Sequence, residues 1–181
     1  MNVKQRLVRI TLVSALALGM GAVVAAPGGA AAPVQKCAHL KGTATITPGL
    51  SPAPHNQTVV AKGALTTCTP TAATGGSGTI NATIKLTNGS CQGLVGGGQK
   101  LAGTAKTTWK NKKTSSYSLV FTTGKGSAAT VATITGKVTA GLFKGHKVSA
   151  QVKIAPGNGQ DCVTKPVKSV TLVTTKPWQI V

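Results

Sequence analysis

Apolar and polar residues alternate along most of the chain after residue 37. In residues 78–87, apolar residues occupy every second position from Ile80 to Leu86, and threonine, asparagine or lysine fills the positions between them. Residues 147–154 repeat this pattern. Because successive side chains of a β-strand point to opposite faces, both segments are predicted to be strands with one buried face.

Further strands are predicted where β-branched and aromatic residues follow the same period of two. Turn sequences such as Asn88-Gly89 separate these runs, and no segment after residue 37 has the 3.6-residue period of a helix. The spacing predicts eight or nine antiparallel strands, arranged as a β-sandwich or as a flattened β-barrel. The additional segments are residues 43–47, 57–67, 101–109, 117–121, 132–140 and 167–175.

The N-terminal residues have the pattern of a secretory signal peptide. Lys4, Arg6 and Arg9 precede an apolar stretch over residues 10–26, and small residues crowd around its end. We expect a signal peptide over residues 1–25, a flexible arm over 26–36 and a single all-β domain over 37–181. The alternative is an uncleaved membrane anchor, although the apolar stretch is close to the minimum spanning length.

The charge balance is strongly basic. The chain has 20 Lys and Arg, one acidic residue and a formal net charge of +19. Without residues 1–25, 17 lysines and Asp161 remain, which gives 17 − 1 = +16. A single carboxylate excludes the paired acids of most glycosidases and the carboxylate-rich sites that bind Ca²⁺ or two metal ions.

Four cysteines, Cys37, Cys68, Cys91 and Cys162, follow the signal peptide. An even number in a secreted chain indicates two disulfide bonds. Of the three connectivities we favour Cys37–Cys68 with Cys91–Cys162, because the first pair would flank a local hairpin, but the sequence does not decide among them. No metal-ligand spacing is present, so neither a metal nor another cofactor is expected.

Catalytic residues are sparse. A Ser-His-Asp site could use only Asp161 with His39, His55 or His146, and no Gly-x-Ser-x-Gly elbow is present. A hydrolase built on Asp161 is therefore the least favoured hypothesis. The prediction is a protein without catalytic activity.

The cluster Lys110, Lys112 and Lys113 beside Trp109 is the predicted binding site. The positive electrostatic field of so many lysines attracts polyanions, and we expect anionic envelope polymers or lipid headgroups as partners. High charge for solubility alone is the competing interpretation. Sequence-specific nucleic-acid binding is not expected, because the chain after residue 25 has no arginine to read base edges.

Several short motifs stand out along the chain: residues 47–51, Gly89-Ser90-Cys91, residues 103–109 with Asn111, residues 141–145 and the late Cys162. With these motifs the chain resembles a family of small secreted actinobacterial proteins without an established function. Residues 46–65 also resemble enediyne-binding apoproteins, which are secreted sandwiches with a ligand cleft, although the cysteine positions and the basic charge differ from that family. This second resemblance implies ligand binding.

Two functions follow from these features. The first is a secreted, non-catalytic binding or structural protein of the cell envelope or extracellular space, with loose lysine-mediated affinity for anionic surfaces. The second is a carrier of an apolar small molecule in a barrel or sandwich cleft near Trp109 and Trp178.

Overall fold

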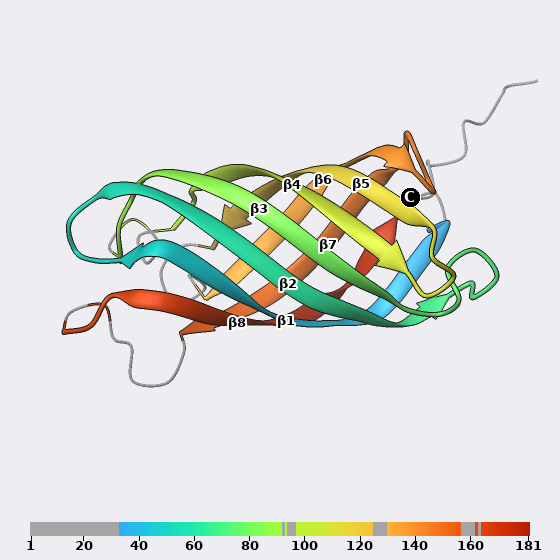
Figure 1. Ribbon diagram of the computed structural model, residues 1–181, viewed down its shortest axis with the longest axis horizontal. Helices are drawn as coiled ribbons and strands as arrows, with labels where there is room; N and C mark the ends of the chain where they lie inside the picture. The colour runs from blue at the N-terminus through green and yellow to red at the C-terminus, as the bar shows by residue number, and fades with distance from the viewer. Residues whose placement is uncertain (1–32, 92, 94–96, 125–129, 157–161, 163) are drawn as a thin grey trace, which may run out of the picture. The chain divides into compact units, whose positions relative to one another are not determined.

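The computed structural model describes residues 33–91, 93, 97–124, 130–156, 162 and 164–181. These residues belong to one compact unit, Ala31–Val181. Eight strands run antiparallel to their neighbours, and β8 pairs with β1, so the sheet closes into a barrel (Figure 1). The expected all-β antiparallel architecture is confirmed, and of the two arrangements expected from the sequence the structure is the barrel.

Each strand pairs with the next one along the chain, so the topology is a simple up-and-down barrel. The strands are β1 (Gln35–Leu50), β2 (His55–Thr69), β3 (Gly78–Gly89), β4 (Lys100–Trp109), β5 (Thr114–Thr123), β6 (Val131–Gly141), β7 (Lys147–Pro156) and β8 (Val167–Ile180). Since β1 begins at Gln35, residues 35 and 36 of the expected flexible arm lie in the barrel wall.

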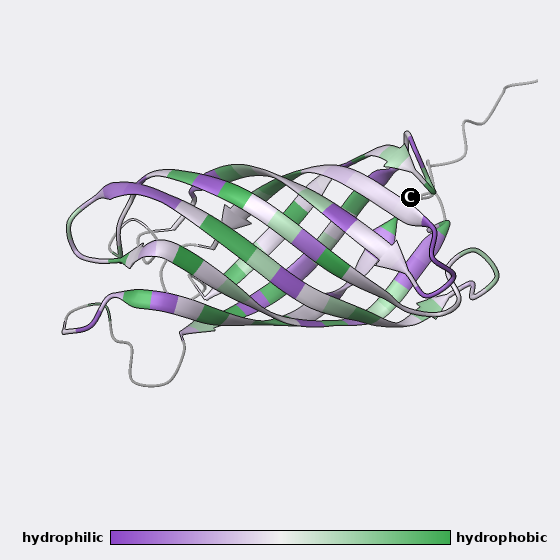
Figure 2. Ribbon diagram, in the orientation of Figure 1, coloured by the Kyte–Doolittle hydropathy of each residue, from purple (hydrophilic) through white to green (hydrophobic). Residues whose placement is uncertain are grey.

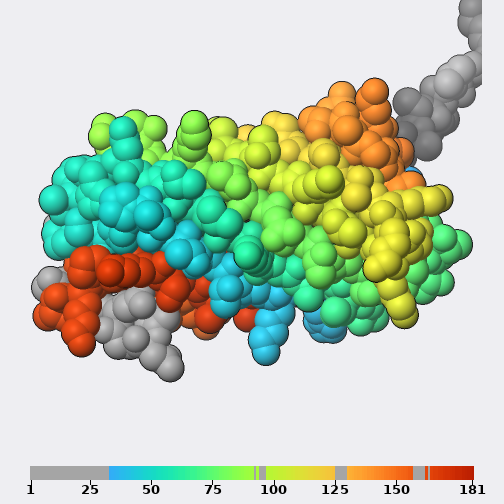
Figure 3. All heavy atoms as spheres, viewed as in Figure 1, coloured from blue at the N-terminus to red at the C-terminus, as the bar shows by residue number. Residues whose placement is uncertain are grey.

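The alternation seen in the sequence separates the inside of the barrel from the outside. In β3 the buried residues Ile80, Ala82, Ile84 and Leu86 alternate with exposed ones. Figure 2 shows hydrophobic and hydrophilic residues following one another along the strands. On the face shown in Figure 3, the side chains of neighbouring strands cover the wall without a gap. The apolar set is thereby removed from water on the inner face.

Two glycines allow the backbones of β1 and β2 to approach each other closely. Gly42 and Gly63 are direct partners across these strands, and a Cβ on Gly42 would collide with the Lys62 carbonyl oxygen and the Gly63 Cα. Only glycine permits so close an approach of two backbones. The pair therefore also leaves two inward positions without side chains.

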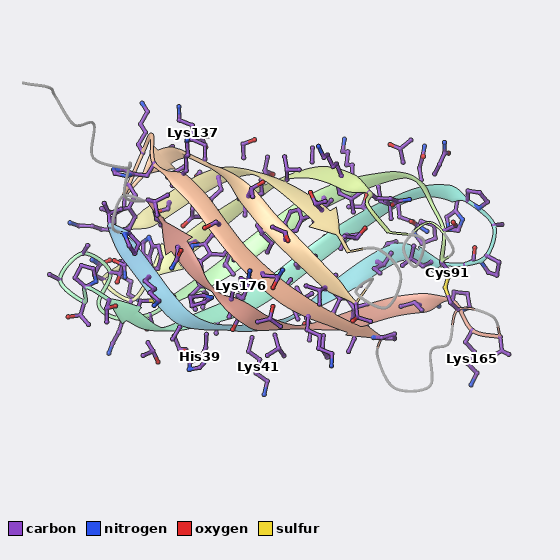
Figure 4. All side chains as sticks on the ribbon, turned by 180° about the vertical axis from the view of Figure 1, so that it is seen from behind. His39, Lys41, Cys91, Lys137, Lys165 and Lys176 are labelled. Atoms are coloured by element: carbon purple, nitrogen blue, oxygen red, sulfur yellow. A yellow bond between two sulfur atoms is a disulfide. The ribbon has the colours of Figure 1, made fainter. Side chains whose placement is uncertain are left out.

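The two ends of the barrel differ. We call one the tryptophan end; it holds the turns at residues 70–77, 110–113 and 142–146 and both ends of the described chain. We call the other the loop end; it holds the connection at residues 51–54 and the described parts of three longer connections, which are residues 90–91, 93, 97–99, 124, 130, 162 and 164–166. Figure 4 shows Lys137 near the tryptophan end and Cys91 and Lys165 at the loop end.

Disulfide bonds join Cys37 to Cys68 and Cys91 to Cys162. Cys37 and Cys68 are cross-strand partners in the β1–β2 hairpin, so the predicted local bridge is confirmed. Cys91 and Cys162 link two connections at the loop end. The predicted signal peptide and Asp161 lie outside the described residues. None of the described helical residues forms a span long and apolar enough to cross a membrane.

Candidate functional site: an apolar cavity inside the barrel

The interior contains a cavity of about 110 Å³ that is lined almost entirely by apolar side chains. The buried core is split into two clusters, one that includes Leu40, Leu119 and Trp178 and one that includes Ile46 and Leu50. Residues of both clusters line the cavity. The cavity therefore lies where the two halves of the core fail to fill the barrel.

Small residues explain why the barrel is not filled. The interior of an eight-stranded barrel is just wide enough for side chains of ordinary size to occupy it. Here six inward positions on the cavity wall carry glycine or alanine. They are Gly42, Ala44, Ala61, Gly63, Ala82 and Ala132. Each removes several carbon atoms from the interior relative to a leucine or valine, so a void remains.

Trp178 on β8 forms part of the cavity wall toward the tryptophan end. Its side chain is 1% exposed, and its Nε1 has no hydrogen-bond partner. Trp109 is equally buried but lies outside the cavity, and its Nε1 donates to Ser115 Oγ at 2.9 Å. Ser115 Oγ in turn donates to the Leu142 carbonyl oxygen at 2.8 Å. The two tryptophans therefore differ: the Nε1–H of Trp109 has an acceptor, whereas the buried Nε1–H of Trp178 has none.

Tyr117 packs against Trp178, with ring centroids 5.5 Å apart in an edge-to-face arrangement. Burial raises the pKa of the Tyr117 phenol, and the nearby hydroxyls of Thr107 and Ser115 oppose that rise. Neither Thr107 nor Ser115 forms a hydrogen bond with the Tyr117 hydroxyl, because this hydroxyl is buried without a partner, as is Thr107 Oγ1. The amide of Gln35, which is fully buried, is also unpartnered. Among the described residues, the buried polar side-chain atoms without a partner therefore lie toward the tryptophan end, except Gln57 Oε1 at the loop end.

The loop end is more fully hydrogen bonded. The two ring nitrogens of His55 contact the carbonyl oxygens of Ala53 at 2.9 Å and Gly49 at 3.1 Å. Gln57 is buried beside it and donates from Nε2 to the Gly89 carbonyl oxygen at 3.3 Å. These contacts tie the β1–β2 connection to the end of β3.

The predicted binding residues lie away from the cavity. Lys110, Lys112 and Lys113 occupy the exposed turn between β4 and β5, at the tryptophan end. Trp109 precedes them in the sequence but is buried inside the barrel, so it does not share their surface. The structure brings the three lysines together and separates Trp109 from them. Of the two tryptophans expected near a ligand, only Trp178 lines the cavity.

The outer surface is basic. All sixteen lysines among the described residues are exposed. Lys137 and Lys147 are direct partners across β6 and β7, so two like charges face each other on the outside of the wall. Like charges directly opposite each other destabilise a sheet.

The histidines are dispersed. His39 lies on β1, His55 begins β2, and His146 lies in the turn between β6 and β7. Within the described part of the chain, no three His, Cys, Asp or Glu side chains come together in a way that could hold a metal ion. The cavity itself therefore offers apolar contact rather than acid–base groups.

All eight strands supply residues that line the cavity, β4 through Leu101 alone, so foreseeing the cavity would have required the arrangement of every strand. The available signal was the run of alanines and glycines at inward phases of β1 and β2. No family model, curated protein or solved structure matches the chain. The resemblance to small secreted actinobacterial proteins stays a prediction.

Proposed function

We propose that the protein is a secreted, non-catalytic carrier that holds a small apolar molecule inside its barrel. The observation that carries the proposal is the cavity of about 110 Å³ with its apolar wall. A void of about 150 Å³ with a similar lining stays dry in water and takes up benzene. A molecule of roughly six carbon atoms is therefore the appropriate size class.

A secreted location is supported by the disulfide bonds, because such bonds persist in oxidising compartments. The exposed lysines keep the outside of the barrel hydrated while the ligand remains inside. A carrier needs this division between a polar surface and an apolar interior.

The test is a titration of the isotope-labelled protein without residues 1–25 with benzene and with n-hexane, monitored by two-dimensional NMR. The expected result is saturable shifts at amides of cavity-lining residues such as Ala61, Ala82 and Ala132. The exposed Ala64 on β2 and Ala102 on β4 are internal controls that should not shift. Shifts absent up to the solubility limit of both ligands, or scattered over the outer surface, would contradict the carrier proposal.

A second candidate function is docking on anionic polymers or lipid headgroups. It is favoured by the concentration of lysines around the tryptophan end. These are Lys36, Lys110, Lys112, Lys113, Lys137, Lys144 and Lys147. A positive field of this kind attracts a polyanion through many weak contacts that salt weakens. The two functions are compatible, because the lysines lie outside the wall and the cavity lies within it.

Docking is tested with a triple variant in which Lys110, Lys112 and Lys113 become glutamine. It should elute from heparin and from envelope material at lower salt than a control with the same charge change. The control replaces Lys85, Lys100 and Lys153, which are also exposed but lie in other parts of the wall. Equal elution of both triple variants would mean that the charge acts generically and that the cluster is no site.

A further inference from the structure

The wall of the cavity, which is formed by described residues, presents no polar atom to the space inside. Only two of the lining residues, Lys62 and Thr123, carry a polar side chain. The Lys62 side chain is exposed on the outside of the barrel. Thr123 Oγ1 accepts a hydrogen bond from the backbone N–H of Gln99 at 3.2 Å. A molecule in the cavity therefore meets carbon and hydrogen on every side.

Three alanines lie side by side on this wall. Ala44 on β1 is the direct partner of Ala61 on β2, and Ala61 is the direct partner of Ala82 on β3. All three line the cavity, and we call them the alanine row. Gly42 and Gly63, which are direct partners on the same two strands as Ala44 and Ala61, extend this surface of small residues. A molecule lying against the row contacts methyl groups only.

We propose that the carried molecule is a hydrocarbon without any hydrogen-bonding group, and that the alanine row sets this selectivity. The inference rests on the proposed carrier function and narrows its ligand to one chemical class. Alcohols, ketones and fatty acids of the same size are rejected, although each of them has an apolar part.

The physical reason is the cost of removing a polar group from water. A hydroxyl or carbonyl that enters this cavity loses its hydrogen bonds to water and finds no partner, and this loss opposes binding. A carboxylate loses more, because every described lysine is exposed on the outside and none offers a charge to the interior. A hydrocarbon has no hydrogen bonds to lose and gains from leaving water.

The experiment compares n-hexane, 1-pentanol and pentanoate by NMR titration of the protein without residues 1–25. n-Hexane and 1-pentanol each have six non-hydrogen atoms, so they differ in one terminal group and not in size. We expect n-hexane to bind at least about a hundredfold more tightly than 1-pentanol. Pentanoate should cause no saturable shift at the cavity-lining residues.

Every apolar site prefers n-hexane to some degree, so a second arm changes the wall itself. Ala82→Ser places one hydroxyl beside the ligand, and the gain of one net hydrogen bond should raise the affinity of 1-pentanol relative to n-hexane about tenfold. Ala150→Ser is the matched control, because Ala150 is buried but does not line the cavity. It should leave the ratio unchanged. Using a ratio cancels any change in cavity volume, since both ligands experience it.

The outcomes separate this inference from the carrier proposal. If n-hexane binds but is preferred to 1-pentanol by less than about a hundredfold, the hydrocarbon inference fails and the carrier proposal stands. Tighter binding of 1-pentanol or pentanoate than of n-hexane would also overturn the inference, as would an unchanged ratio in both Ala82→Ser and Ala61→Ser. If none of the three ligands binds, both proposals fail. The comparison of ligands uses the unchanged protein, so it remains decisive even if the serine variants do not fold.

Discussion

Replacing Ala82 with leucine should fill the cavity and displace its ligand. Ala82 is buried on β3, faces the barrel interior and lines the cavity. Leucine adds three carbon atoms, and each buried CH₂ group contributes about 0.8 kcal/mol, so the upper limit of the gain is about 2.4 kcal/mol. Ordering the leucine side chain subtracts about 0.5–1 kcal/mol. A net gain of roughly 1.5 kcal/mol remains if the added atoms enter the void without strain.

The same substitution elsewhere should have a different result. Ala150 on β7 is buried in the packed core but does not line the cavity, so leucine there has to displace its neighbours. Such overpacking costs about 1–3 kcal/mol. Ala64 on β2 is exposed, and Ala64→Leu should change stability by less than about 0.5 kcal/mol.

Urea denaturation of the three ligand-free variants measures these free energies, and the NMR titration with n-hexane measures binding. Ala82→Leu should weaken n-hexane binding at least tenfold by the loss of volume, whereas Ala64→Leu should leave it unchanged. The reasoning is refuted if Ala82→Leu destabilises the protein as much as Ala150→Leu, since no free space would then exist. It is also refuted if Ala82→Leu keeps the full affinity for n-hexane.

Three further predictions follow from single features of the barrel. Replacing Cys37 and Cys68 with alanine opens a 31-residue loop and should lower the free energy of unfolding by about 3.7 kcal/mol, as measured in urea against the disulfide-bonded parent protein. Because burial raises the pKa of Tyr117, the folded state holds the phenol proton more tightly than the unfolded state. The stability that the protonated Tyr117 phenol contributes is complete below its ordinary pKa of about 10 and is lost as the pH rises through its raised pKa in the folded protein. Tyr117→Phe has no phenol to ionise, so its free energy of unfolding should fall less than that of the parent between about pH 8 and pH 11. Lys147→Glu should convert its repulsion with Lys137 across β6 and β7 into attraction, and should stabilise the barrel by about 0.2–1 kcal/mol at low salt. This gain should shrink as salt is added. An equal gain at high salt would contradict the electrostatic explanation.

Much of the fold could be predicted because the alternation is local. Residues 78–87 and 147–154 carry a period of two, and β3 and β7 are found over these positions. The bridge between Cys37 and Cys68 was favoured for a similar reason, since it spans one hairpin. Patterns of this kind depend on neighbours along the chain, so they are visible before the strands are assembled.

The candidate site was less accessible to the sequence. Trp109 and Lys110 are adjacent in the chain, which suggested a shared binding surface. In the barrel, Trp109 is the last residue of β4 and points inward, whereas Lys110 begins the exposed turn. A strand's two faces separate neighbours by the full thickness of the wall, so adjacency in the sequence was misleading at this point.

The all-β class, the inward and outward faces of the strands and the basic exterior could be predicted before the strands are assembled. These depend on the residue types at alternate positions and on a net charge that assembly does not change. The assembled barrel was needed to see that β8 closes on β1, that small residues such as Ala61 and Ala82 leave a common void, and that Trp178 borders this void. Closure joins strands from opposite ends of the chain, and a cavity is the volume that their side chains together leave unfilled; neither quantity belongs to any one segment.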